Sequence, residues 1–487
     1  MTDIAEVTAV ESVTSDPGIG EALGRIWTEA GLPPEALARF QFSGRDPALP
    51  SSFRIGTAAV VPIAAAALAA AELHRVRTGV EQSVAVDMAH ACAEFRSERF
   101  VRVDGEAPPS PWDKIVGAYR CGDGRWIRIH TNFPHHRDGI LALLGCDYDR
   151  EAVANAFLQW DADRFEEAAS RAGMIAAVER SAAEWKDHPQ AAAAAGLPLL
   201  SIDRIGDAAA EPLAPADRPL AGVRVLELTR IVAGPVAGRT LAAHGATVLR
   251  VLGPDVPTVE TLDIDNGRGK LSASLDLRTA SGRAVLEELI AGADVFLQSY
   301  RPGALEALGF SPARVAAIRP GIVQATLSAY QPAGPWHDKR GFDSIVQTAT
   351  GFNRDEGEAK GTGEPTALPA QSLDHGSGHL LAFGTIVALL RRHREGGSWR
   401  VATSLAQVGE WLRSLGRIDN GFSIPDPGFE EAAPFLEESD SGWGRLLAVR
   451  HAAALSSTPA RWTEPAMPYG THEARWPERR APRPEKR

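Results

Sequence analysis

The stretch VRVLELTRIVAGPVAGRTLAAHGATVLRV, residues 223–251, decides the fold. Each end is a short apolar run bounded by turn residues, which predicts strands over 223–228 and 246–251. The residues between them, 234–244, are mostly small and apolar and predict a helix. A strand, a helix and a second strand in this order form a right-handed crossover between parallel strands. We therefore expect a parallel α/β sheet to begin here.

The same alternation continues further along the chain. Apolar runs at 295–297 and 322–326 predict two more strands, and periodic segments at 281–290 and 312–318 predict the intervening helices. Repeated strand–helix units of this kind build a sheet that has helices on both faces. The fold class expected for this half is therefore a Rossmann-like, doubly wound parallel α/β sheet.

A proline-rich boundary separates this half from the residues before it. Three prolines lie within 211–219, and proline disfavours both a helix and the hydrogen bonds of a sheet. Because 487 residues exceed an ordinary domain of about 150 severalfold, several domains are expected. We expect a lead-in segment over 1–47, a second α+β domain over 48–215, the Rossmann-like module over 216–421, and a C-terminal return segment with a basic tail over 422–487.

The domain at 48–215 contains a predicted hairpin and a helical stretch. Residues 115–120 and 125–130 alternate in the strand pattern on either side of a Gly-Asp-Gly turn. From 151 to 196 the sequence is rich in Ala and Glu with helical periodicity, so helices are expected there.

Composition narrows the class of protein. The chain is 44% hydrophobic and 23% charged with a net charge of −11, which is typical of a soluble fold and disfavours nucleic acid as a partner. Its 3 cysteines are too few and too scattered for a disulfide framework or a zinc site. The N-terminus has no signal-peptide pattern, and the Ala-rich run at 58–71 is shorter than the ~20 apolar residues of a spanning helix. We expect a cytoplasmic protein with no membrane partner.

One acidic residue distinguishes two similar segments. When the segment at 51–89 is laid without gaps over the one that contains Asp374, Gly79 falls on Gly396 and Thr57 falls on Asp374. Both segments read as a helix followed by a short strand. The first copy has no acidic residue between Asp46 and Glu72, so the chain carries what reads as one framework twice, with a carboxylate at this position in the second copy only.

Two interpretations of Asp374 are open at this point. Small neighbours on either side would let a substrate approach, and free amides at a helix start would stabilise its carboxylate, as a nucleophile requires. The simpler interpretation is an N-cap residue. Spacing alone favours the N-cap.

Basic loops are expected at the ligand-binding edge of the sheet. The loop at 229–235 follows the first strand, where parallel sheets bind ligands, and its amides suit an anion. Three further loops are basic, at 266–270, 301–303 and 339–343, and together they suit a diphosphate or a 3′-phosphate. The alternatives are solvated surface charge for these loops and close packing for Gly234. The dinucleotide fingerprint is absent, which disfavours a nicotinamide cofactor.

A histidine-rich loop raises the question of a metal site, because histidine is a common metal ligand. His130, His135 and His136 have neither the helical spacing nor the acidic partner of a zinc site, so an ordinary polar loop is expected and no metal.

The motifs are similar to those of the class III CoA-transferase family, the carnitine CoA-transferase and formyl-CoA transferase group. They are PLAGVRVLELTR at 219–230, AGP at 233–235, GK at 269–270 with LDL at 275–277, YRPGAL at 300–305, GP at 334–335, GFD at 341–343, and the helix of Asp374. The resemblance covers 218–410 in this order and spacing.

The resemblance implies a function and a site. Asp374 matches the catalytic nucleophile, which would carry CoA from an acyl-CoA donor to a carboxylic acid acceptor through covalent anhydride and thioester intermediates. The CoA thioester would be a substrate, with no permanently bound cofactor. The residues that match the family's CoA contacts are Val232, Ala233, Arg268, Gly269, Lys270, Arg301, Arg340 and Phe342.

The resemblance also implies an unusual arrangement. Residues 48–215 look like the part of a family chain that normally follows the nucleophile, so the order is permuted or the chain is a truncated tandem fusion. Family members form interlocked homodimers, and this chain would form either such a dimer or an intrachain pseudo-dimer. The racemase branch has a histidine where Phe342 stands, which favours transfer. The alternatives are a CoA-dependent isomerase and a catalytically silent CoA-binding subunit.

Overall fold

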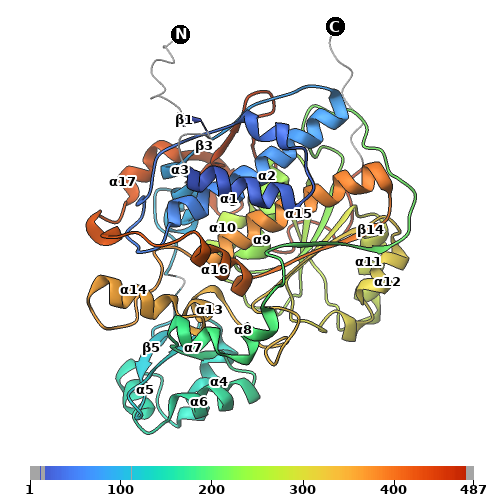
Figure 1. Ribbon diagram of the computed structural model, residues 1–487. Coiled ribbons are helices and arrows are strands. Elements are labelled where there is room, and N and C mark those ends of the chain that lie inside the picture. Colours follow the sequence, from blue (N-terminus) through green and yellow to red (C-terminus); the bar gives the residue numbers. More distant parts are fainter. Residues whose placement is uncertain (1–10, 13–16, 111, 479–487) are drawn as a thin grey trace.

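The computed structural model of the chain describes residues 11–12, 17–110 and 112–478. It is a mixed α/β protein whose largest element is a seven-stranded sheet, with a smaller α+β lobe to one side (Figure 1). The proline-rich boundary at 211–219 is a loop, as expected.

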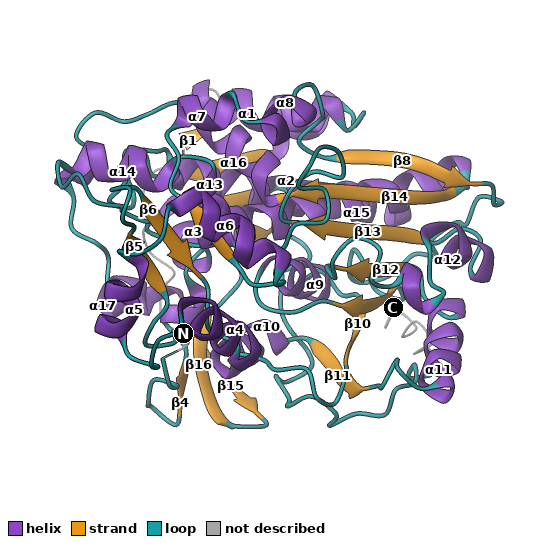
Figure 2. Ribbon diagram, turned by 90° about the horizontal axis from the view of Figure 1, so that it is seen from below, coloured by secondary structure: helices purple, strands orange, loops and turns teal. Residues whose placement is uncertain are grey.

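The sheet has the order β11-β10-β9-β12-β13-β14-β8 (Figure 2). Its first six strands are parallel, and β8 pairs antiparallel with β14 at the edge. The strand bounds are β8 Ser201–Gly206, β9 Arg224–Leu228, β10 Thr247–Leu252, β11 Lys270–Ser274, β12 Val295–Gln298, β13 Val323–Ser328 and β14 Ser398–Ser404. Chain order runs outward in both directions from β9, so the order reverses between β9 and β12, where open α/β sheets bind ligands.

Helices cover both faces of this sheet because successive strand residues point to opposite sides. Val225 belongs to the core beneath α9 Ala233–Ala243 and α15 Ser372–Glu395, whereas Leu226 belongs to the core beneath α11 Ala280–Ala291 and α12 Pro312–Ile318. The elements expected at 223–251, 281–297 and 312–326 are therefore present, with boundaries within two residues. The edge strand β8 was not expected, and it comes from the domain that precedes the boundary.

The small lobe surrounds the expected hairpin. Strands β5 Gly117–Arg120 and β6 Trp126–Ile129 pair antiparallel, with Arg120 opposite Trp126. The stretch 151–196 is mostly helical, but it also contains a strand, β7 Ala176–Val178, which pairs with β6. This strand is fully buried, and burial on the sheet outweighs the helical propensity of its alanines. The helices of the lobe are α4 Pro134–Leu144, α5 Arg150–Phe157, α6 Ala162–Arg171, α7 Ala182–Lys186 and α8 Pro189–Ala194.

Helix α2 Ile55–Thr78 is long and apolar enough to cross a membrane by composition alone, yet its apolar part is completely buried inside the protein. It packs against α15 in the centre of the molecule, with α1 Pro17–Glu29 beside it (Figure 1). It is longer than the Ala-rich run at 58–71 because the helix begins at Ile55 and continues through 72–78, and Pro62 is accommodated within it.

Helices α2 and α15 agree in length and in their ends. Both have 24 residues, and both start after a residue with nearly equal dihedral angles, φ −79° and ψ 66° at Arg54 and φ −77° and ψ 62° at Gln371. Each then leads through a glycine of positive φ, Gly79 or Gly396, into a strand and a short helix. Those elements are β3 Val84–Asp87 and α3 Met88–Glu94 in the first segment, and β14 and α16 Leu405–Ser414 in the second.

The C-terminal segment returns to the first half of the chain. Strand β17 Ala453–Leu455 pairs with β3, and β16 Gly444–Val449 pairs with β4 Arg102–Val103. The other elements are β1 Glu11–Ser12, η1 Pro34–Arg39, β2 Phe40–Ser43, η2 Ser97–Arg99, α10 Glu260–Gly267, η3 Glu306–Leu308, α13 Asp343–Ala349, α14 Phe352–Lys360, η4 Gly421–Ser423, α17 Phe429–Ala432, η5 Ala433–Phe435 and β15 Leu436–Ser441. The last residues of the expected basic tail lie outside the described residues.

Candidate active site

Asp374 lies in the first turn of α15 and is 7% exposed. Because α15 leads into β14, which is parallel to β13, the start of α15 lies at the carboxyl edge of the sheet. Among the described residues, none donates a hydrogen bond or forms an ion pair to the Asp374 side chain. A nearly buried carboxylate without a partner at the ligand edge is costly, and such groups mark functional sites.

Asp343 holds the backbone at this position. Its Oδ2 accepts hydrogen bonds from the backbone N–H groups of Leu373, at 2.8 Å, and Asp374, at 2.9 Å. The Gln347 side chain donates to its Oδ1. The cap of α15 therefore comes from α13 and not from Asp374, so the N-cap interpretation of Asp374 is wrong.

Two neighbouring carboxyl groups raise the proton affinity of this site. Burial raises the pKa of Asp343 to about 6. Burial, followed by the negative charges of Asp343 and Glu98, raises the pKa of Asp374 well above its ordinary value. A carboxylate of raised pKa is a more basic nucleophile and ionises less readily.

The start of α2 is capped in the same way as the start of α15, but the residue at the matching position is Thr57 and not an aspartate. Asp46 accepts hydrogen bonds from the N–H groups of Gly56, at 2.9 Å, and Thr57, at 3.0 Å. The Thr57 hydroxyl also donates to Asp46, at 2.6 Å. Asp46 thus corresponds to Asp343, and Thr57 occupies the place of Asp374. No sequence pattern pointed to Asp46, which lies in the expected lead-in segment 1–47.

The loop after β9 is strained beside α15. Ile231 has φ 75°, an outlier for a β-branched residue, and its carbonyl accepts a bond from Asn266 Nδ2 at 3.4 Å. Ala233 follows and is buried with Val232, and a Cβ placed on Gly378 would lie 2.6 Å from the Ala233 oxygen. Gly378 therefore lets α15 approach the start of α9, one turn after Asp374.

Gly234 is explained by packing. A Cβ placed on it would lie 2.5 Å from the Thr229 side chain. The packing interpretation of this glycine therefore holds, although the loop remains at the ligand edge.

Three arginines gather at the same edge. Arg230 follows β9, Arg301 follows β12, and Arg340 lies between β13 and α13. Burial lowers the pKa of Arg340, and the charges of Arg301 and Arg230 lower it further, so the three act in one field. Within the described part of the chain, no carboxylate lies within ion-pair distance of any of the three. This uncompensated positive charge suits an anionic ligand.

Arg268 and Lys270 do not join this cluster. Arg268 precedes β11 and Lys270 is its first residue; because β11 is parallel to β10, both lie towards the amino ends of the strands. Arg268 donates to Asp265 Oδ1 at 2.6 Å and to the Val449 carbonyl at 2.7 Å. The expected grouping with the ligand-edge loops is therefore wrong for these two cations, whereas Asn266 of the same segment donates to the Ile231 carbonyl in the loop after β9.

Lys270 is fully buried. Its Nζ lies 2.8 Å from Glu227 Oε2 and donates to the Pro235 carbonyl at 2.7 Å. Burial lowers the pKa of Lys270 to about 8. Gly269, with φ 78°, leaves room for the Trp462 ring, which a Cβ would approach within 2.5 Å. These three residues build the core, and a contact of this segment with CoA stays a prediction.

Phe342 lies at the interface between sheet and lobe. Its ring stacks on that of His130, with centroids 4.0 Å apart. Burial lowers the pKa of His130 and that of His136 to about 3 each, so both rings are neutral. The Nε2 atom of His136 lies 3.4 Å from Arg340 Nη1. In the described ranges no group of His, Cys, Asp and Glu side chains has the arrangement of a metal site.

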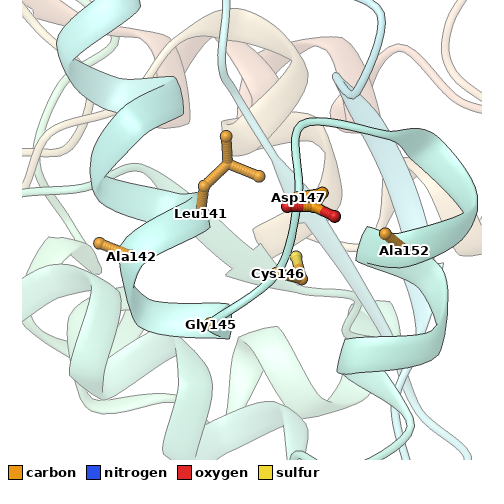
Figure 3. A pocket seen from close by; sticks show the side chains of 6 residues that line it. All are labelled: Leu141, Ala142, Gly145, Cys146, Asp147 and Ala152. Carbon is orange, nitrogen blue, oxygen red and sulfur yellow. The ribbon is translucent and has the colours of Figure 1, made fainter.

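A surface hollow of about 600 Å³ lies in the lobe between α4 and α5 (Figure 3). Its lining includes Cys146 and Asp147 from the connecting loop. It contains a carboxylate and no cationic side chain, so its chemistry does not suit a phosphate-bearing ligand.

Fold and site together define an α/β protein with a buried carboxylate and a cluster of arginines at its ligand edge. The sequence matches CoA-transferase family III over residues 43–214 and 220–416, and the chain belongs to this family. The resemblance inferred from the motifs is thereby confirmed. The two matched stretches meet at the proline-rich boundary.

Two named CoA-transferases agree with this assignment. An acetyl-coenzyme A transferase of Hypoxylon pulicicidum is 29% identical over 80% of this chain and 74% of its own length. A formyl-CoA:oxalate CoA-transferase of Rhodopseudomonas palustris is 32% identical over 47% of this chain and 58% of its own. A solved protein of Mycobacterium tuberculosis shares 36% identity over 41% of this chain and 58% of its own, with a TM-score of 0.38.

Proposed function

We propose that this protein is a CoA-transferase that moves CoA from an acyl-CoA donor to a carboxylic acid acceptor, with Asp374 as the nucleophile. The observation that carries the proposal is the state of Asp374: a buried carboxylate at the ligand edge, with its amide held by Asp343 and its side chain without a partner. Family membership and the names of the relatives support the substrate class.

The first half of the reaction transfers CoA to the enzyme. A carboxylate oxygen of Asp374 attacks the thioester carbonyl carbon; a C–O bond forms, the C–S bond breaks, and a mixed anhydride and CoA thiolate result. The thiolate then attacks the Asp374 carbonyl carbon of the anhydride. This releases the donor acid as a carboxylate and leaves an aspartyl-CoA thioester.

The second half runs in the opposite sense. The acceptor carboxylate attacks the aspartyl thioester and expels the thiolate, which attacks the acceptor carbonyl carbon of the new anhydride. The acyl-CoA product leaves and the Asp374 carboxylate is regenerated. The cycle consumes no net proton, so the site needs no group that donates or accepts one. This agrees with the surroundings of Asp374, which contain the carboxylates of Asp343 and Glu98 and no cation paired with Asp374.

The arginine cluster supplies the charge that CoA requires. Arg230, Arg301 and Arg340 lie at the carboxyl edge that also holds Asp374, and no described carboxylate neutralises them. We assign the phosphate groups of CoA to this cluster. Val232, Ala233 and Phe342 line the same edge and would contact the ligand through backbone and apolar surface.

We further propose that the chain forms a pseudo-dimer with itself. The helices α2 and α15 pack together, begin with the same capping device and lead into matching elements. In this arrangement the Rossmann-like module and the first domain are in permuted order, and only the α15 copy carries a nucleophile. A single active site per chain follows.

Mass spectrometry of the intact protein tests the proposal. The protein is incubated with formyl-CoA, acetyl-CoA and a long-chain acyl-CoA, with and without oxalate, acetate or succinate, and quenched in acid. We expect an acyl or CoA adduct on Asp374, absent in Asp374→Ala and present in the control Asp46→Asn, which alters the matching device on α2. Absence of any adduct, together with equal product formation by Asp374→Ala, would overturn the proposal.

The same experiment separates the alternatives. A CoA-dependent isomerase would convert the acyl-CoA without an added acid. A silent subunit would bind CoA with unchanged affinity in Asp374→Ala and form no product.

A further inference from the structure

A short segment of the first domain faces the helix of Asp374. Glu94 and Glu98, four residues apart, lie opposite His379 and His375, also four apart on α15. The Glu94–His379 distance is 3.9 Å, and the Glu98–His375 distance is 3.5 Å. Phe95 stacks on both histidines, with ring centroids 5.9 Å from His379 and 5.4 Å from His375. The two carboxylates thus form two similar pairs with α15.

The Glu94 carboxylate is satisfied by other groups, although His379 Nε2 has no hydrogen-bond partner among the described residues. Glu94 Oε2 accepts hydrogen bonds from the Ala452 N–H, at 2.7 Å, and contacts His451 Nδ1, at 3.1 Å. Burial alone would raise the pKa of Glu94, but His451, His379 and Arg239 hold it well below its ordinary value. Glu94 therefore connects the first domain, α15 and the C-terminal segment, which is a structural role.

The pair at Glu98 is not satisfied. Among the described residues, neither Glu98 Oε2 nor either ring nitrogen of His375 has a hydrogen-bond partner, although these atoms are buried. His375 is 1% exposed and directly follows Asp374 in the chain. Unpaired buried polar atoms are costly, and a native protein keeps them where they serve a function.

The segment that carries Glu98 is fixed on both sides. Ser97 Oγ donates to Asp265 Oδ2 at 2.5 Å, and Arg99 Nη2 donates to the Pro369 carbonyl at 2.7 Å, just before α15. The hydrogen bonds of its two neighbours, Ser97 and Arg99, therefore fix the position of Glu98 beside His375.

We propose that Glu98, supplied by the first domain, is a positioning residue that acts with His375 to make the Asp374 carboxylate a stronger nucleophile. The inference rests on the proposed role of Asp374. The negative charge of Glu98 destabilises the Asp374 anion, and this repulsion is relieved when acylation removes the charge from Asp374. The first domain thereby contributes to the site although its own helix carries Thr57.

The charged groups around this pair set the direction of its pH dependence. Asp343 and Glu98 face Asp374, while Arg99 and Asp265 lie near Glu98 and His375. Because the charge of Glu98 raises the pKa of Asp374, its removal must lower that pKa. The acidic limb of the pH–rate profile for acylation of Asp374, where the rate falls as the carboxylate becomes protonated, then moves to lower pH.

The first test compares Glu98→Gln with Glu94→Gln as the matched control. Acylation of Asp374 by acetyl-CoA, without an acceptor, is followed by acid quench and mass spectrometry across the acidic and neutral range. We expect Glu98→Gln to slow acylation at neutral pH about tenfold, the size typical of coupling between neighbouring groups, and to move the acidic limb to lower pH. Glu94→Gln should lower thermal stability and leave the limb in place. An unmoved limb in Glu98→Gln overturns the inference while leaving the nucleophile intact.

The second test requires no substrate. Thermal stability at neutral pH is measured for Glu98→Gln, Asp374→Asn and the double variant. We expect Glu98→Gln to raise the melting temperature when Asp374 is present and to give a smaller gain when it is replaced by Asn. Equal effects in both backgrounds would show that Glu98 does not act on Asp374. If no acyl donor reacts while this coupling is observed, the proposed function fails and the electrostatic link stands.

His375→Phe tests the partner of Glu98. The ring would keep its stacking on Phe95 but lose the imidazole nitrogens that face Glu98. Because Glu98 is proposed to act on Asp374 together with His375, we expect the acidic limb to move in the same direction as in Glu98→Gln, with no further movement in the double variant. Additive movements would overturn the joint action.

Discussion

Asp343 Oδ2 lies 2.9 Å from the backbone nitrogen of Asp374, so one buried carboxylate fixes the position of the other without touching its side chain. The bond leaves both oxygens of Asp374 free to react, while the negative charge of Asp343 makes them more basic. A contact that would ordinarily serve only as a helix cap therefore also raises the basicity of the proposed nucleophile.

Removing this cap should affect stability and reactivity together. In Asp343→Ala the N–H groups of Leu373 and Asp374 lose their acceptor, which should lower the free energy of unfolding by about 1–2 kcal/mol. The lost charge should also move the acidic limb of Asp374 acylation to lower pH. Denaturant unfolding and the adduct assay measure the two effects.

Asp46→Ala provides the control for that variant. It removes the equivalent acceptor at the start of α2, beside Thr57. We expect a similar loss of stability, about 1–2 kcal/mol, with an unchanged pH profile of acylation. A shifted profile in Asp46→Ala would mean that helix position, and not charge beside Asp374, sets the reactivity.

Asp374 itself should reduce stability at neutral pH. Its pKa in the folded protein lies well above 3.8, so the folded state binds more protons than the unfolded state above that pH. Stability therefore decreases as pH rises through this window, and the loss is complete above the folded pKa. We expect Asp374→Asn to raise the melting temperature at neutral pH by at least about 2 °C, while abolishing acylation. Calorimetry at acidic and neutral pH measures this, and an equal gain at both pH values would contradict it.

Sequence patterns predicted the sheet because its signals are local. The strand at 223–228 and the helix at 234–244 differ from β9 and α9 by only a residue at their ends. The strand β7 was missed because its pattern is short and lies among alanines, where burial decides the outcome.

Side-chain partners across long sequence distances could not be predicted in the same way. The pattern Arg268-Gly269-Lys270 is typical of a phosphate loop, but Glu227 and Asp265 use its charges in the core. Asp46 and Glu98 have no local signal at all, because their roles depend on α2 and α15 lying side by side. Asp374 could be predicted from sequence because two similar segments of the chain differ at this position, where the first has Thr57.

The arginine cluster should determine affinity for CoA. We expect Arg340→Met and Arg301→Met each to raise the KM for acyl-CoA about tenfold, because each loses a charge-assisted bond to a phosphate group, with kcat little changed. Arg314→Met serves as the control, since Arg314, on α12, forms an exposed ion pair with Glu287 on α11. Steady-state kinetics at two salt concentrations measures the effect, and an unchanged KM in both cluster variants would contradict the assignment.

Lys270 should matter for folding and not for CoA. In Lys270→Met the Glu227 carboxylate remains fully buried without its cation, which should lower the free energy of unfolding by about 3–5 kcal/mol. Because that variant could fold poorly, the double variant Lys270→Met with Glu227→Gln is measured beside it. Replacing both charges should recover part of the loss, since a buried pair costs most when one partner is removed. Calorimetric titration of the double variant with CoA should give an unchanged Kd. A Kd raised tenfold or more in the well-folded double variant would instead place this segment at the phosphate site, as its composition alone had suggested.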